Sequence, residues 1–139
     1  MLIEEITDRL NGLEILIEER IKDIETVSNF IAKNTIQLNQ LEYELDEVEF
    51  DIRTSISNWK DVGCNNKEER ELYVKTRDEY KLILFDIQRI NNDIIEYKHT
   101  LDVAEKELKF YNRMYDRYSK LEDNTLSKIC KSGDNCGCR

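Results

Sequence analysis

Three cysteines close to the C-terminus, Cys130, Cys136 and Cys138, are the residues of this sequence best suited to bind a metal. Thiolates bind zinc and other soft metals, but a structural zinc site needs four protein ligands. The remaining candidates, Cys64 and His99, lie far from this cluster along the predicted helices, so a fourth ligand would have to come from outside the chain. We therefore expect no cofactor and reduced thiols, with a disulfide or a metal site as the alternatives.

A catalytic site is not expected from the rest of the sequence. The chain has a single histidine, and it has neither a glycine-rich phosphate-binding loop nor a pair of metal ligands at a typical spacing. A chain built only from long helices also offers no deep concave pocket. These observations favour a protein that is not an enzyme.

A second group of residues, between Leu41 and Asp51, combines aromatic rings with negative charge. The stretch holds six acidic residues and no basic residue, and Tyr43 and Phe50 stand seven residues apart on one face of a helix. Aromatic anchors surrounded by carboxylates suit a basic protein surface, whereas the alternative is an ordinary solvated helix face. Together with two other apolar residues off the helix interface, the expected partner-binding residues are Ile36, Glu42, Tyr43, Glu44, Asp46, Glu47, Glu49, Phe50, Asp51 and Phe85.

A third group places basic and aromatic residues together within 106–120. A positively charged groove with aromatic rings can hold a nucleic acid through phosphate contacts and base stacking. The alternative is that acidic residues within 4–19 neutralise these bases through salt bridges between helices. The candidate nucleic-acid-binding residues are Lys106, Lys109, Phe110, Arg113, Arg117 and Lys120.

A long helix, predicted over residues 1–58, must position the acidic group. Branched aliphatic residues recur at every seventh position from Ile3 to Ile52, and a second, mostly apolar series starts at Ile6. A spacing of 3.5 residues held over several heptads indicates helices packed in a left-handed coiled coil. Arg20 interrupts the second series and is expected either to lie opposite Ala104 and the Glu105 carboxylate or to extend into water.

A second helix is predicted over residues 67–126, with heptad series that start at Tyr73 and Thr76. The periodicity fades after this helix, so residues 127–139 are expected to form a flexible, cysteine-containing tail.

Residues 59–66 interrupt the pattern and are predicted to form a turn. Gly63 can adopt a positive φ, and Asn66 can cap the second helix with Glu69 as its capping-box partner. Two helices of similar length with one short break predict an all-α fold, a long antiparallel two-helix coiled-coil hairpin. The alternative, a continuous rod that dimerises in parallel, fits Gly63 less well.

Apolar residues also occur away from both heptad series. A two-helix hairpin leaves these positions in water, which suggests a homodimer that forms a four-helix bundle, or a bound partner. Scattered exposed apolar residues are the alternative, because single exposed apolar side chains are common. The positions are Ile15, Ile36, Tyr43 and Phe50 on the first helix, and Leu82, Phe85, Val103 and Phe110 on the second.

Composition limits the class of protein. The net charge is −9, and the first 58 residues hold 14 acidic and 5 basic residues, which excludes a uniformly basic nucleic-acid binder. Proline is absent and no run of apolar residues approaches 18, so we expect long helices and no span of a membrane. No signal peptide is recognisable, and we expect a soluble protein of the cytoplasm.

The turn and the start of the second helix read Gly63-Cys64-Asn65-Asn66-Lys67-Glu68-Glu69-Arg70. A Gly-x-Asn sequence, a short acidic run with Arg70 and a long heptad helix resemble a group of small coiled-coil proteins of bacteriophages and mobile elements. The helix–turn–helix layout is similar across nearly the whole chain, apart from the cysteine-containing tail. The resemblance implies a phage-type origin, an accessory role near recombination or anti-defence genes and a location in the host cytoplasm. It implies no catalytic residues.

These observations lead to one functional expectation with an alternative. We expect an acidic, dimeric interaction protein that binds a host or phage protein and, in a phage setting, inhibits a host nuclease or defence complex. The alternative is a nucleic-acid-binding accessory protein of a phage recombination or replication module.

Overall fold

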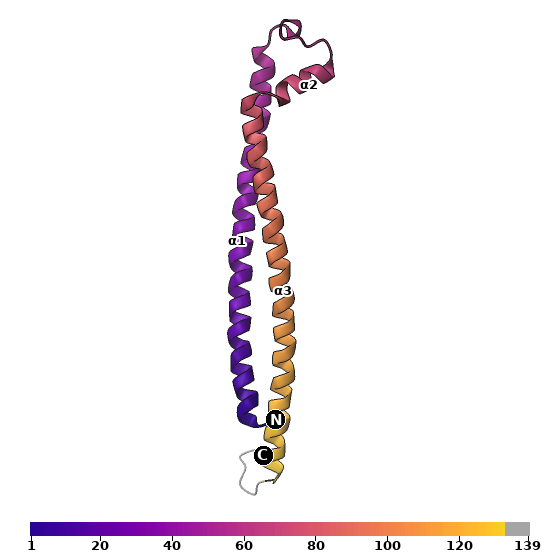
Figure 1. Cartoon of the computed structure of the whole chain (residues 1–139). Coiled ribbons are helices and arrows are strands. Elements are labelled where there is room, and N and C mark those ends of the chain that lie inside the picture. The colour runs from indigo at the N-terminus through magenta and orange to yellow at the C-terminus, as the bar shows by residue number, and fades with distance from the viewer. Residues whose placement is uncertain (133–139) are drawn as a thin grey trace. The chain divides into compact units, whose positions relative to one another are not determined.

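The computed structural model describes residues 1–132 and consists of helices joined by a short connection (Figure 1). Two long helices, α1 and α3, pack against each other in opposite directions, and this confirms the predicted antiparallel hairpin. The elements in chain order are α1 (Ile3–Ser55), the 3₁₀ helix η1 (Trp59–Val62), α2 (Lys67–Lys75) and α3 (Asp78–Ser132).

The predicted heptad series form the interface between α1 and α3. Every residue of the first series, from Ile3 to Ile52, is buried or half-buried, although α1 is mostly exposed elsewhere. On α3 the series that contains Ile87 and Ile94 is likewise turned inward. Each helix therefore buries one stripe of side chains, as the 3.5-residue spacing requires.

The described part of the chain divides into two compact units. The first unit combines Met1–Ser28 with the part of α3 that starts at His99. Its buried residues are Ile6, Leu10, Val27 and Ala104. Because Ala104 is small, the two helices leave room beside it for the longer side chain of Arg20.

Polar contacts join the two helices of the first unit beside this core. Nη1 of Arg20 donates to Oε2 of Glu107 at 2.9 Å, and the Tyr115 hydroxyl donates to Oε1 of Glu14 at 3.0 Å. The prediction of a carboxylate opposite Arg20 is confirmed, but the residue is Glu107 and not Glu105. A heptad pattern determines which faces of the two helices meet. Because the pattern repeats, it does not determine how far one helix is shifted along the other.

The second unit, Asn29–Lys98, contains the other halves of the helices and the connection. Its most buried side chains are Ile90 and Val74, each 1% exposed. The rings of Phe30 and Tyr97 stack with their centroids 5.4 Å apart. Aromatic and aliphatic packing thus replaces the interhelical ion pair of the first unit.

The connection confirms the predicted turn chemistry. Gly63 has φ 80° and ends η1, and the Asn66 side chain accepts a hydrogen bond from the Glu69 N–H at 2.8 Å to cap α2. The Glu69 carboxylate accepts from the N–H of Asn65 at 2.6 Å, one residue before the expected Asn66. These contacts satisfy N–H groups that the first turn of a helix leaves free.

Residues of η1 and α2 form a small cluster of their own. Trp59 and Tyr73 pack edge to face at 5.9 Å, and Arg70 lies over the Trp59 ring at 5.7 Å. Cys64 is 5% exposed, and its thiol lies 3.5 Å from the Glu69 carbonyl oxygen. The connection is therefore packed by its own side chains.

The predicted second helix is interrupted between α2 and α3. The Tyr73 carbonyl oxygen accepts from the Thr76 hydroxyl and from Nε of Arg77, both at 3.1 Å. The Arg77 guanidinium also lies 4.0 Å from the Tyr73 ring centroid. Side chains that bond to nearby carbonyls compete with regular helix bonds, and heptad spacing does not reveal such a local competition.

The start of the predicted tail lies in a helix, because α3 continues to Ser132 and includes Cys130. Cys130 is disulfide-bonded, so the expectation of a reduced thiol is wrong for this residue and the disulfide alternative holds for it. Cys136 and Cys138 lie outside the described residues, so their thiol state and the metal site stay predictions. None of the helices described for residues 1–132 is both long enough and apolar enough to cross a membrane.

We predict that Ile90→Ala lowers the free energy of unfolding by about 2–5 kcal/mol, because it leaves a cavity at a fully packed position. Ile95 is 64% exposed on the same helix and serves as the matched control. Its replacement by alanine should change the free energy by less than about 0.5 kcal/mol. Urea denaturation followed by circular dichroism measures both values, and equal losses would show that the helix interface is not where the structure places it.

A second prediction concerns the turn. Gly63→Ala forces a side chain into a positive φ, so it should destabilise the protein by about 1 kcal/mol or more. Gly12 lies inside α1, and a Cβ built there meets no atom within 4 Å. Gly12→Ala should therefore stabilise the helix by roughly 0.5–1 kcal/mol, and thermal melting compares the two variants.

Candidate functional site

The predicted acidic group forms a hollow on the solvent side of α1 in the second unit. Tyr43 is 65% exposed and Phe50 is 66% exposed. With Asp46, Glu47 and Asp51 they line a hollow of about 450 Å³. We call this site the Tyr43–Phe50 hollow, because the two rings stand at its ends and the three carboxylates lie between or beside them.

A neighbouring carboxylate interacts with the Tyr43 hydroxyl in this site. Its hydroxyl is hydrogen-bonded to Glu47, one helical turn away, and this bond raises the pKa of Tyr43 above its ordinary value. The negative charge of Glu47 raises the pKa further, because it opposes formation of the phenolate. The Tyr43 hydroxyl therefore keeps its proton to a higher pH than an ordinary phenol does.

The other predicted partner-binding residues do not line the hollow. Ile36 and Phe85 are 69% and 64% exposed. Glu49 is half-buried and pairs with Arg53 at 3.1 Å, so its charge is partly compensated within α1. Glu42 and Glu44 are exposed on the same helix. The structure thus selects a smaller group of residues than the sequence predicts.

The basic residues on α3 are not neutralised in the way that the sequence suggests. Of the bases within 106–120, Lys106 pairs with Asp102 on the same helix at 2.8 Å. This pair lowers the pKa of the Asp102 carboxyl and raises the pKa of Lys106. The remaining four bases form no ion pair with any residue in 1–132; we call them the basic surface, and they are Lys109, Arg113, Arg117 and Lys120.

The expected salt bridges to acids within 4–19 are absent among the described residues. Of these acids, Glu14 accepts from the Tyr115 hydroxyl, and Glu19 lies 3.7 Å from Arg20. The long basic side chains instead extend from the exposed face of α3. The salt-bridge explanation of the basic group is therefore wrong for residues 1–132.

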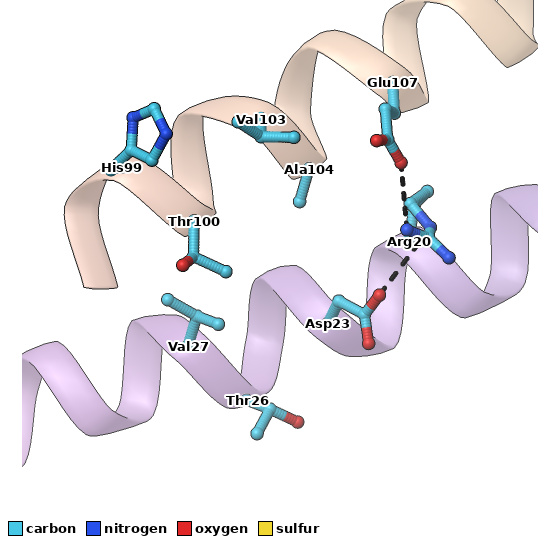
Figure 2. Close-up of a pocket in the computed structure, with 9 residues that line it drawn as sticks. All are labelled: Arg20, Asp23, Thr26, Val27, His99, Thr100, Val103, Ala104 and Glu107. Carbon is cyan, nitrogen blue, oxygen red and sulfur yellow. Dashed lines mark hydrogen bonds and ion pairs between the residues drawn. The ribbon is translucent and has the colours of Figure 1, made fainter. Parts of the chain in front are cut away.

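A hollow of about 440 Å³ lies between α1 and α3 in the first unit (Figure 2). Arg20 extends along its edge and contacts Glu107, with Asp23 3.6 Å from its Nε. That distance exceeds the usual length of a hydrogen bond, and Nε is buried without a hydrogen-bond partner. Figure 2 shows the ring of His99 turned away from α1, so it forms no acid–base pair with Asp23.

The charged residues around this hollow form a structural contact between α1 and α3. Three carboxylates surround the Arg20 guanidinium, including Glu19 at 3.7 Å, and they already compensate its positive charge. An added anion would meet these carboxylates and be repelled. Within residues 1–132 no group of three histidine, cysteine or acidic side chains is arranged to hold a metal ion.

A third hollow, which sequence analysis did not predict, surrounds Gly12 in the first unit. We call it the Gly12 groove; it has a volume of about 270 Å³ and is lined by Arg9, Gly12, Leu13, Leu16, Phe110, Tyr111, Met114 and Tyr118. The missing side chain of Gly12 opens the groove between the helices. A lone glycine inside a long helix was the available signal, because glycine is unfavourable there.

Comparison of this chain with models of known protein families, with curated proteins and with solved structures finds no match. The candidate sites are therefore judged by their own geometry.

We predict that Glu47→Gln lowers the pKa of Tyr43 toward the ordinary value of 10.0, because it removes the carboxylate charge that opposes ionisation. Glu14→Gln is the matched control, since Glu14 raises the pKa of Tyr115 in the same way. NMR titration of ring-labelled tyrosine should show each substitution acting on its own tyrosine. A pKa of Tyr43 that does not change in Glu47→Gln would contradict the hydrogen bond.

Proposed function

We propose that this chain is a non-enzymatic interaction protein that binds a basic surface of another protein through the Tyr43–Phe50 hollow. The observation that carries the proposal is the placement of two largely exposed rings around three carboxylates on a single rigid helix. Burial of an aromatic side chain supplies much of the energy of a protein interface, and the surrounding charges guide the encounter.

The rigidity of the site supports this function. α1 is a continuous helix from Ile3 to Ser55, so the spacing between Tyr43 and Phe50 is set by helix geometry. A partner would therefore bind a preformed surface and lose little conformational entropy in ordering it.

We also propose that the partner is a host protein and that binding inhibits it, as expected for a phage accessory factor. This part rests on the resemblance carried by the residues from Gly63 to Arg70, together with the acidic character of the α1 surface. A nuclease or another defence protein that binds DNA presents a basic cleft, and carboxylates can occupy such a cleft in place of phosphates.

A second candidate function, binding of nucleic acid, is favoured by the basic surface on α3. Its four bases lie beside Phe110, which is 56% exposed. The net charge of −9 opposes it, because a chain of this charge repels a polyanion at low salt. We rank it second for this reason.

We predict that Tyr43→Ala and Phe50→Ala each raise the dissociation rate of the partner at least about 10-fold, because a buried aromatic anchor contributes about 2 kcal/mol or more. The partner is first isolated by co-purification from host lysate, and surface plasmon resonance then measures the rates. Ile95→Ala, which removes an equally exposed side chain outside the hollow, should leave the rate unchanged.

The carboxylates should act on a different step. Replacement of Asp46, Glu47 and Asp51 by their amides should lower the association rate and flatten its dependence on salt, since exposed charges are screened beyond roughly 8 Å at physiological ionic strength. Equal dissociation rates for the wild type, Tyr43→Ala and Phe50→Ala would overturn the proposed function. Binding of DNA that weakens on charge reversal of Arg113 would favour the second candidate.

A further inference from the structure

The Gly12 groove and the basic surface together form an apolar hollow whose edge on α3 is positive. Phe110 and Met114 line the groove, and Lys109, Arg113 and Arg117 occupy neighbouring positions on the same helix. Residues three or four apart on a helix lie on one face, so the bases stand beside the apolar lining. Between 109 and 120 the chain holds four bases and one acid.

The groove is large enough for one aromatic side chain. A cavity of roughly 150 Å³ can hold benzene, whereas this groove has a volume of about 270 Å³. Phe110 and Tyr111 lie with their ring centroids 5.9 Å apart and give the groove an aromatic wall. The groove therefore fits a segment that carries exposed aromatic rings among negative charges.

The chain itself contains such a segment in its other unit. The stretch between Leu41 and Asp51 has six acids and no base, and its Tyr43 and Phe50 are mostly exposed. The two rings are seven residues apart, as are Tyr111 and Tyr118, which line the groove. Two helices that pack side by side require this heptad spacing of apolar residues, with opposite charges along the edges.

We propose that this protein associates with itself, so that the Tyr43–Phe50 hollow of one copy binds the Gly12 groove and basic surface of a second copy. Each copy carries one acidic and one basic surface, so the acidic surface of one copy can pair with the basic surface of the other. This inference rests on the proposed docking role of the Tyr43–Phe50 hollow and names one partner for it. A foreign basic protein would then compete with the second copy for the same site.

A second copy fits the groove better than a nucleic acid. The groove has an apolar lining, whereas phosphate contacts alone would leave that lining unused. The net charge of −9 opposes a polyanion and also a second copy of the same charge, so the local pairing of the acidic segment with the bases must exceed this repulsion.

The test is the solution mass of the full chain by analytical ultracentrifugation, from about 1 to 100 μM and at low and high salt. We expect a mass above the 16.6 kDa of one chain, with association that weakens as salt rises. Two charge-reversed variants localise the contact. One carries Glu44→Lys, Glu47→Lys and Asp51→Lys, and the other carries Lys109→Glu, Arg113→Glu and Arg117→Glu; all six side chains are exposed.

Each charge-reversed variant alone should associate at least about 10-fold more weakly than the wild type, since like charges then face each other. An equimolar mixture of the two should regain association, because the reversed surfaces complement each other and the native surfaces do as well. Circular dichroism checks that each variant keeps its helices. A wild-type monomer throughout the concentration range, or a mixture that stays dissociated, would overturn the proposal.

Gly12 provides a test that leaves every charge in place. Gly12→Leu fills the groove and should weaken association at least about 10-fold, whereas Gly12→Ala adds one methyl group in open space and should retain most of it. Equal association constants for Gly12→Leu and Gly12→Ala would show that the groove is not part of the contact. If the wild type is monomeric but binds a single-stranded oligonucleotide through Arg113 and Arg117, the basic surface belongs to a nucleic acid.

These outcomes separate the inference from the proposed function. If the wild type self-associates but Tyr43→Ala and Phe50→Ala leave the dissociation rate of the partner unchanged, the inference holds and the proposed function is excluded. If the wild type is monomeric and the same substitutions weaken binding of the partner, the proposed function holds and the inference is excluded.

Discussion

Burial of a single stripe on each helix is the constraint on which this protein depends. In a two-helix hairpin only the facing stripes leave water, and here they consist of residues such as Ile6 and Ile90, which are 0% and 1% exposed. The hydrophobic effect acts on the area removed from water, so the other faces add nothing to it. Any apolar residue on those faces is therefore available to something other than the fold.

This constraint gives the two kinds of surface different roles. Alanine in place of an interface residue such as Ile87 disturbs the packing of both helices, because that side chain is 7% exposed. Tyr43 and Arg113 are exposed outside the interface, so they can change with little loss of stability. The acidic and basic surfaces can thus evolve separately from the hairpin that carries them.

The sequence predicted the elements that depend on repetition and missed those that depend on single contacts. The helices and the turn followed from the heptad spacing and from Gly63. The partner of Arg20 was misplaced by two residues, because a repeating pattern fits several similar alignments of the helices. The interruption near Arg77 was missed because it arises from side-chain bonds to one carbonyl group.

The candidate sites divide in the same way. Tyr43 and Phe50 were predicted because exposed aromatic rings among acids are conspicuous in a sequence, and the structure brings them together in one hollow. The groove beside Gly12 was not predicted, since it is created by a side chain that is missing. How the two sites could match each other was also not predicted, because the match depends on which side chains the folded helices bring to each surface.

The buried thiol of Cys64 has a consequence for how the protein opens. The thiol is 5% exposed within the connection, so a reagent reaches it only when η1 and α2 separate. If the helices of the hairpin stay paired during that event, alkylation of Cys64 reports a local free energy that is smaller than the global one. The rate of Cys64 alkylation thus reports how often the connection opens. Spectroscopic signals would not show this opening, because the two long helices dominate them.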